Sequence, residues 1–158
     1  MPERETNAKA AFGLPLVFQN GVFMISGLSH ITFITGNLDK TSRIFIDVLG
    51  GKEIYDSAAK NFSISHEKFF VVGDIWVVIM EGESLPSRTY NHIAFKTDDA
   101  GLERAKRAIE KLDLEIKPSR PRVEGEGQSL YFYTYDNHLI ELHTGTLHER
   151  LKRYSEST

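Results

Sequence analysis

Ser29 to Thr35 reads SHITFIT and Asn91 to Thr97 reads NHIAFKT, and these two stretches decide the fold. Each alternates apolar and polar residues, as a strand with one buried face does. After each of them comes an amphipathic helical pattern, and then three β-rich segments separated by short polar or glycine-containing breaks. The chain therefore carries the order βαβββ twice, and such an internal repeat marks a structural unit.

Neither half can bury a sheet face alone, so the sequence predicts an α+β fold in which the two βαβββ modules pair into one curved mixed sheet around a central cavity. The first module is predicted to contain a strand at 28–35, a helix at 38–51 that Asn37 caps, and strands within 52–57, 63–73 and 74–82. The second is predicted to contain a strand at 90–97, a helix at about 99–112, and strands within 114–118, 129–135 and 138–145.

We expect residues 1–23 to be an appendage, with an added strand or a dimer arm as the alternative. Glu3 and Glu5 stand where a secretory signal would be basic, and Gly13 and Pro15 interrupt the only apolar stretch there. Residues 24–158 are then expected to form a single domain, made of module one at about 27–82, module two at about 89–145 and a tail helix at about 146–155.

The composition limits which partners the protein is expected to bind and which side chains could hold a metal ion. Hydrophobic residues make up 41% and charged residues 26%, the balance of a soluble globular protein. A formal net charge of -3 provides no basic field for nucleic acid or for an anionic membrane, so neither partner is expected. The chain has no cysteine, which fits a reducing, cytoplasmic compartment and leaves only His, Asp or Glu to hold a metal ion.

His30, His92 and Glu141 stand out as candidate metal ligands. Aligning the opening strands puts His30 over His92, and aligning the closing strands DIWVVIM and NHLIELH puts Val78 over Glu141. A single strand histidine is commonly structural, but two at equivalent positions of a repeat can converge with a carboxylate across a pseudo-twofold axis. Two imidazoles and one carboxylate leave about half of an octahedral shell open, and Val78 cannot add a ligand. The pattern predicts an open catalytic centre that could accept Mn²⁺, Fe²⁺, Zn²⁺, Co²⁺ or Ni²⁺.

Five runs of sequence carry a further signal: GLSHIT, EKFFVVGDIW, YNHIAF, RPRVEGEGQSLYFY and DNHLIELHTGTLHERL. Together they resemble the fosfomycin-resistance proteins of the vicinal oxygen chelate superfamily, over Met24 to about Tyr154. The resemblance is to the metal-dependent fosfomycin epoxide hydrolases rather than to the glutathione and bacillithiol transferases, because the run ISHEKFF places a glutamate at position 67.

The resemblance implies a mechanism and an assembly. His30, His92 and Glu141 match the family's three metal ligands, and the ion implied is Mn²⁺. Glu67 matches the general base, which takes a proton from the water that opens the epoxide of fosfomycin. A homodimer is also implied, in which His30 could come from one chain and His92 with Glu141 from the other.

Fosfomycin is a small phosphonate, so its site needs cationic and hydroxyl donors. The positions that match phosphonate-contacting residues of the family are Thr32, Ser129, Tyr131 and Arg150, and Trp76 matches an aromatic residue that lines the pocket. Arg122 ranks below them, because the loop that carries it cannot be aligned residue by residue.

The connection from Lys117 to Gln128 is long and rich in glycine and charge, which favours a mobile segment over a ligand. Glu124 and Glu126 within it are expected to be solvated.

Three alternatives stay open. They are a thiol transferase of the same superfamily, a non-catalytic drug-binding module, and a hydrolase of another small epoxide or phosphonate. Glu67 argues against the first of these, and an open metal triad argues against the second.

Overall fold

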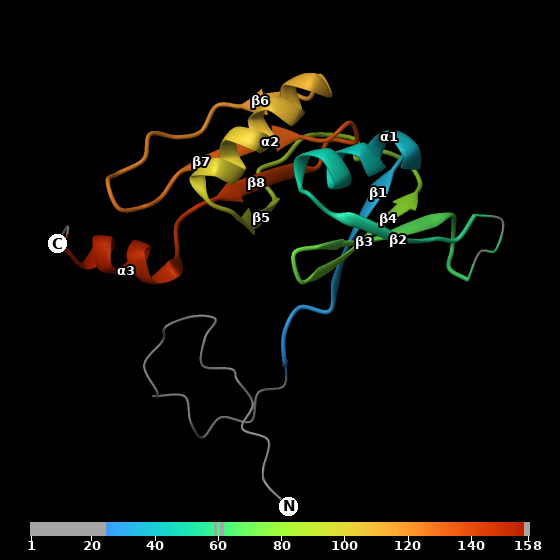
Figure 1. Ribbon diagram of the computed structural model, residues 1–158, viewed down its shortest axis with the longest axis horizontal. Helices are drawn as coiled ribbons and strands as arrows, with labels where there is room; N and C mark the ends of the chain where they lie inside the picture. Colours follow the sequence, from blue (N-terminus) through green and yellow to red (C-terminus); the bar gives the residue numbers. More distant parts are fainter. Residues whose placement is uncertain (1–24, 59, 61, 157–158) are drawn as a thin grey trace, which may run out of the picture.

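The structure, a computed structural model, describes residues 25–58, 60 and 62–156, so residues 1–23 lie outside the described part. The first module contains β1 (His30–Thr35), α1 (Leu38–Arg43), η3 (Ile44–Val48), β2 (Lys52–Asp56), β3 (Glu67–Val72) and β4 (Ile75–Glu81). The second contains β5 (His92–Lys96), α2 (Asp99–Lys111), β6 (Ile116–Lys117), β7 (Ser129–Tyr133) and β8 (Leu139–His143), and α3 (Leu147–Ser155) follows it (Figure 1). The predicted α+β class and the repeated βαβββ order are confirmed.

Each module forms its own four-stranded mixed sheet, in the orders β1-β4-β3-β2 and β5-β8-β7-β6. The pairs β1–β4 and β5–β8 are parallel, and the other pairs are antiparallel. The two registers coincide. Thr32, two residues after His30, pairs with Val78, and Ala94, two residues after His92, pairs with Glu141. Val78 is therefore the structural counterpart of Glu141.

The first helix of the chain changes geometry along its length. Asn37 caps it as expected, its side chain accepting a hydrogen bond from the backbone N–H of Lys40, but α1 passes at Ile44 into the wider π-helical turn η3. Gly50 then adopts a φ of +66°, and a Cβ on Gly51 would lie 2.9 Å from the carbonyl oxygen of Phe45. The two glycines therefore end the helix and let β2 start close against it.

The helices α1, η3 and α2 form one core with both sheets, and α3 takes no part in it. The core joins Phe45 of η3 and Ile109 of α2 to Phe33 of β1, Phe70 of β3 and Phe132 of β7. Because successive strand residues point to opposite faces, the residues that alternate with these core positions point away from the helices. We call the helix-distant surfaces of the two sheets the open faces. They carry His30, Thr32, Glu67, Trp76 and Val78 on the first sheet and His92, Ser129, Tyr131, Glu141 and His143 on the second.

The expected single curved sheet does not form within the described chain. β1 is an edge strand of its sheet and β5 is an edge strand of the other, and the modules are joined through the helical core instead. Each sheet therefore presents a free edge that begins with a candidate metal ligand, His30 or His92. Of the helices that the structure describes, none combines the length and apolarity that a membrane span requires.

Asp136 joins the two modules through a buried carboxylate between β7 and β8. Its Oδ2 accepts a hydrogen bond from Thr35 Oγ1 at 2.6 Å, and its Oδ1 accepts from the Gly36 N–H at 2.9 Å and from Ser84 Oγ at 2.5 Å. Burial alone would raise the pKa of Asp136, but these donors and nearby His138 hold that pKa below its ordinary value. The end of β1 is thus bonded to module two.

Asp136→Ala is expected to lower the free energy of unfolding by about 2–4 kcal/mol, because it leaves several buried donors without an acceptor. Asp136→Asn keeps one carbonyl oxygen and is expected to cost roughly half as much. Urea unfolding at pH 7 measures both values. A loss under about 0.5 kcal/mol for the alanine variant would contradict this role.

The depressed pKa also predicts a pH dependence. The stabilisation by ionised Asp136 is complete above its unfolded pKa of about 3.9 and is lost as the pH falls through the lower folded value. The stability gap between the wild type and Asp136→Asn should therefore narrow below about pH 4.

Candidate metal centre

Two of the three predicted metal ligands meet on the open face of the second sheet. His92 Nε2 lies 3.0 Å from Glu141 Oε2. His92 Nδ1 lies 2.7 Å from the carbonyl oxygen of Tyr90, which can only accept, so we assign the ring hydrogen to Nδ1. The lone pair on Nε2 then faces the carboxylate, and a backbone carbonyl on the other nitrogen is the usual way to orient a metal-binding histidine. The donor set fits a divalent ion.

The second oxygen of Glu141 is engaged by the protein. Oε1 accepts hydrogen bonds from Ser129 Oγ at 2.5 Å and from Arg122 Nη2 at 3.2 Å. Burial raises the pKa of Glu141, but hydrogen bonds from Ser129 and Tyr131 and the neighbouring histidines outweigh it and leave the pKa below its usual value. The carboxylate is therefore held in the ionised form that a metal ion requires.

His30 lies on the other sheet. Its Nδ1 is 3.1 Å from Ser29 Oγ, and its ring packs on Trp76 with centroids 4.6 Å apart. Among the residues that the structure describes, no group of three His, Cys, Asp or Glu side chains could hold a metal ion. The single chain thus brings His92 and Glu141 together, but it does not bring His30 to them.

Glu67 begins β3 on the same open face as His30. It pairs with Met80, as Ser129 pairs with His143 in module two, so Glu67 is the counterpart of the serine that contacts Glu141. Glu67 is only 8% exposed, and within the described residues no hydrogen bond or ion pair engages its carboxylate. A buried carboxylate without such a partner is available to accept a proton.

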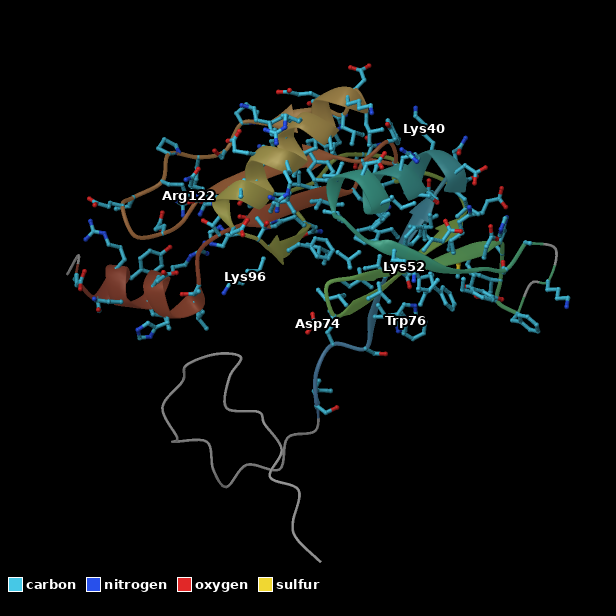
Figure 2. All side chains as sticks on the ribbon, in the orientation of Figure 1. Lys40, Lys52, Asp74, Trp76, Lys96 and Arg122 are labelled. Carbon is cyan, nitrogen blue, oxygen red and sulfur yellow. The ribbon has the colours of Figure 1, made fainter. Side chains whose placement is uncertain are left out.

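Arg122 lies inside the site, although the sequence ranked it below the other candidates. Its Nη2 donates to Ser129 Oγ at 2.5 Å, to Tyr131 Oη at 3.2 Å and to Glu141 Oε1 at 3.2 Å. Figure 2 shows it on the long loop that precedes β7. Burial, together with Tyr90 and Glu141, raises the pKa of Tyr131, which therefore stays a neutral phenol able to donate.

The loop that carries Arg122 is bonded internally, and the expectation that Glu126 is solvated is wrong. Glu126 is 2% exposed and accepts two hydrogen bonds from the Arg120 guanidinium, at 3.0 and 3.2 Å, and one from the Val123 N–H. Arg120 first, and then Val123, lower the pKa of Glu126 to about 2. Glu124 is exposed, as expected.

The remaining candidate residues, Thr32, Trp76 and Arg150, lie outside the cluster of Arg122, Ser129, Tyr131 and Glu141. Thr32 and His92 line the same groove of about 480 Å³, beside the edges of β1 and β5. Trp76 is 38% exposed on the first open face. Arg150 reaches toward the second sheet from α3, with Nη2 at 3.5 Å from His143 Nε2. Sequence reasoning missed Tyr90, whose carbonyl orients His92, because a backbone acceptor leaves no signal in residue type.

The family model of the Glyoxalase/Bleomycin resistance protein/Dioxygenase superfamily matches residues 27–142. The fosfomycin resistance protein FosX of Mesorhizobium japonicum is 58% identical over 130 residues, which cover 82% of this chain and 94% of that protein. The chain belongs to the FosX family within this superfamily.

A solved FosX structure agrees with this placement. The crystal structure of a FosX variant from Listeria monocytogenes complexed with Mn(II) and 1S,2S-dihydroxypropylphosphonic acid matches with a TM-score of 0.75 at 51% identity, over 83% of this chain and 99% of that one. The metallothiol transferase FosB of Staphylococcus haemolyticus is more distant, at 31% identity over 138 residues, 85% of this chain and 94% of that protein. Within the superfamily, the chain is therefore more similar to these FosX proteins than to that thiol transferase.

Proposed function

We propose that the protein adds water to the epoxide of fosfomycin and so inactivates the antibiotic as a vicinal diol phosphonate. The observation that carries the proposal is Glu67, a buried carboxylate without a described hydrogen-bond partner on the same open face as His30. A variant of the FosX of Listeria monocytogenes was crystallised with 1S,2S-dihydroxypropylphosphonic acid, the kind of diol that water addition yields.

His30, His92 and Glu141 are the residues that would hold the metal ion, for which we propose Mn²⁺ because a FosX structure contains Mn(II). When bound, such an ion acts as a Lewis acid that polarises the epoxide oxygen. The protein's part is to orient the His92 ring through the Tyr90 carbonyl, with Nε2 toward Glu141, and to keep Glu141 ionised through Ser129.

Glu67 takes a proton from water while the water oxygen forms a bond to an epoxide carbon and the epoxide C–O bond breaks. The opened oxygen then receives a proton, so the net reaction consumes one water. Arg122, Ser129 and Tyr131 already converge, with both hydroxyl oxygens within 3.2 Å of the Arg122 guanidinium. A guanidinium beside two hydroxyl groups suits a phosphonate dianion, and Thr32 and Arg150 would add donors to it. Trp76 would close the pocket wall.

We further propose that a second copy of the chain completes the site. His30 and Glu67 occupy one open face, whereas His92 and Glu141 occupy the other, and both faces point away from the shared core. Large apolar side chains remain exposed at these faces, with Val71 at 37%, Trp76 at 38% and Tyr90 at 59%. In a twofold dimer, β1 of one protomer could lie beside β5 of its partner, which would cover both free edges and join the half-sites. A cytoplasmic location, supported by the cysteine-free composition, completes the proposal.

Removal of the metal ion should abolish turnover reversibly. Protein treated with a chelator is expected to lose at least about 100-fold in rate, because Lewis-acid assistance contributes several kcal/mol, and Mn²⁺ should restore it. Phosphorus NMR of fosfomycin incubated without any thiol should show one diol product.

The rival functions give different results in the same assay. Turnover that needs added thiol would identify a transferase, and protection without turnover would identify a drug-binding module. An undiminished rate in metal-stripped protein would contradict the metal's role.

A further inference from the structure

His143 ends β8 two residues after Glu141, on the same open face, and its side chain is 15% exposed. Its Nδ1 lies 2.8 Å from Ser129 Oγ, 3.0 Å from the carbonyl oxygen of Gln128 and 3.7 Å from Glu141 Oε1, and its Nε2 lies 3.5 Å from Arg150 Nη2. We propose that His143 is a positioning residue, which aims Arg150 at the phosphonate of the substrate and holds the Ser129 hydroxyl against the metal-ligand candidate Glu141. This inference rests on the proposed function.

The contacts of the ring select one tautomer. The Gln128 carbonyl can only accept, so Nδ1 carries the hydrogen, and the same N–H also points to Ser129 Oγ. The Ser129 hydroxyl is then oriented to donate its own hydrogen to Glu141 Oε1 at 2.5 Å. Nε2 keeps a lone pair on the opposite edge of the ring, where the Arg150 guanidinium can donate to it. One imidazole therefore orients two side chains from two different elements: Arg150, a candidate phosphonate donor, and Ser129, which donates to Glu141.

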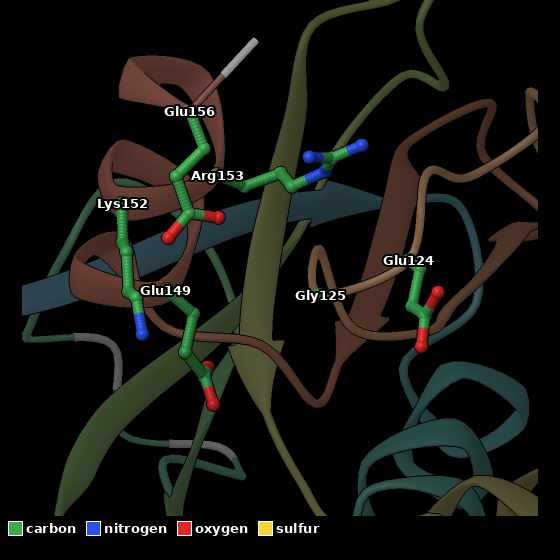
Figure 3. Close-up of a pocket in the computed structure, with 6 residues that line it drawn as sticks. All are labelled: Glu124, Gly125, Glu149, Lys152, Arg153 and Glu156. Atoms are coloured by element: carbon green, nitrogen blue, oxygen red, sulfur yellow. The ribbon is translucent and has the colours of Figure 1, made fainter.

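Arg150 lies on α3, whose Tyr154, by a hydrogen bond and after the larger effect of Arg120, helps to lower the pKa of Glu126 in the loop. None of the nine residues of α3 is buried. Its start is fixed by a capping box between Thr146 and Glu149 and by the close approach of Gly145 to Gly127, where a Cβ would collide with the backbone. Farther along, a cavity of about 410 Å³ separates α3 from Glu124 and Gly125 at the tip of the loop (Figure 3). Because Arg150 is not buried, the position of its guanidinium depends on polar contacts such as the one to His143.

The internal repeat shows that the fold does not require a histidine here. Met80 is the counterpart of His143, because Met80 pairs with Glu67 as His143 pairs with Ser129. Module one thus builds the same strand end with an apolar side chain. The imidazole of His143 is then explained by its polar contacts, and a methionine at this position is a substitution that the fold already accommodates once.

Three variants test separately the contacts that His143 makes at Nδ1, to Gln128 and Ser129, and at Nε2, to Arg150. His143→Asn places an amide near the former Nδ1 and keeps the bond to Gln128 and Ser129, whereas His143→Gln extends an amide toward Arg150. His143→Met, which copies the side chain of Met80, removes the contacts of both ring nitrogens. The probe is methylphosphonate, which carries the phosphonate but no epoxide, and its affinity for the Mn²⁺-loaded protein is measured by calorimetry beside kcat and KM for fosfomycin.

His143→Met is expected to weaken methylphosphonate binding and to raise KM by about 10- to 100-fold, since charge-assisted hydrogen bonds are lost, with a smaller change in kcat and in Mn²⁺ affinity. His143→Asn already lacks the contact to Arg150, so adding Arg150→Ala to it should cost little further affinity for methylphosphonate. His143→Gln should recover part of the methylphosphonate affinity that His143→Met loses. Unchanged binding in folded His143→Met would overturn the inference, as would effects fully additive with Arg150→Ala. A wild-type protein that binds methylphosphonate without hydrolysing fosfomycin would sink the proposed function alone.

Discussion

Glu67→Gln is expected to lower kcat for fosfomycin hydrolysis by about 10²- to 10⁴-fold, the usual contribution of a positioned general base. The amide has the shape of the carboxylate but cannot take a proton from water. Because Glu67 is not one of the proposed metal ligands, the affinities for Mn²⁺ and for fosfomycin should stay within about threefold of the wild type. Initial rates at saturating Mn²⁺ give kcat, and calorimetry gives both affinities.

Glu81→Gln is the matched control for this variant. Glu81 is an exposed carboxylate at the C-terminal end of β4, next to Met80, the residue that pairs with Glu67. It alternates to the opposite face of the sheet from Glu67, so its loss should leave kcat unchanged. Full diol formation by Glu67→Gln would remove Glu67 from the mechanism. A parallel loss of Mn²⁺ binding would make it a ligand or a structural residue instead.

Complementation between inactive chains should restore activity if the site is shared. His30→Ala and His92→Ala each remove one ligand from every site, so both homodimers are expected to be inactive. A heterodimer of the two would contain one site with all its ligands and one with neither histidine, so it should show about half of the wild-type activity. Co-expression with two different affinity tags, followed by purification on both, isolates that heterodimer for assay.

The control pairs two variants from the same half-site. His92 and Glu141 lie 3.0 Å apart on one sheet, so a heterodimer of His92→Ala with Glu141→Ala has a defect in each site and should remain inactive. Recovery in both heterodimers, or in neither, would contradict a site divided between His30 on one protomer and His92 on its partner.

The repeat made much of this arrangement predictable from the sequence. A strand period of two residues fixes which side chains share a face, so aligning the two modules already matched His30 to His92 and Val78 to Glu141, and the registers agree. Alternation cannot tell what covers a face, however. The sequence therefore left open whether His30 joins the other ligands within one chain or across two.

The alignment of the two modules could not predict the loop that carries Arg122 or the contacts that Asp136 makes between the modules. Arg122 enters the site on a segment without periodicity, whose shape depends on the bonds of Glu126 to Arg120 and to the Val123 N–H. Asp136 gathers donors from the end of β1, and nothing in residue type connects positions so far apart in the chain. Such contacts depend on tertiary geometry, which patterns of residue type do not encode.

A single-turnover reaction in H₂¹⁸O tests the central claim most directly. The protein, loaded with Mn²⁺ and free of thiol, is used in excess over fosfomycin, and the product and the peptide that contains Glu67 are both analysed by mass spectrometry. Water activated by Glu67 predicts a diol carrying one ¹⁸O from the first turnover and an unlabelled Glu67. An unlabelled diol with ¹⁸O in Glu67 would show covalent attack by the carboxylate, and no diol at all without thiol would contradict hydrolysis itself.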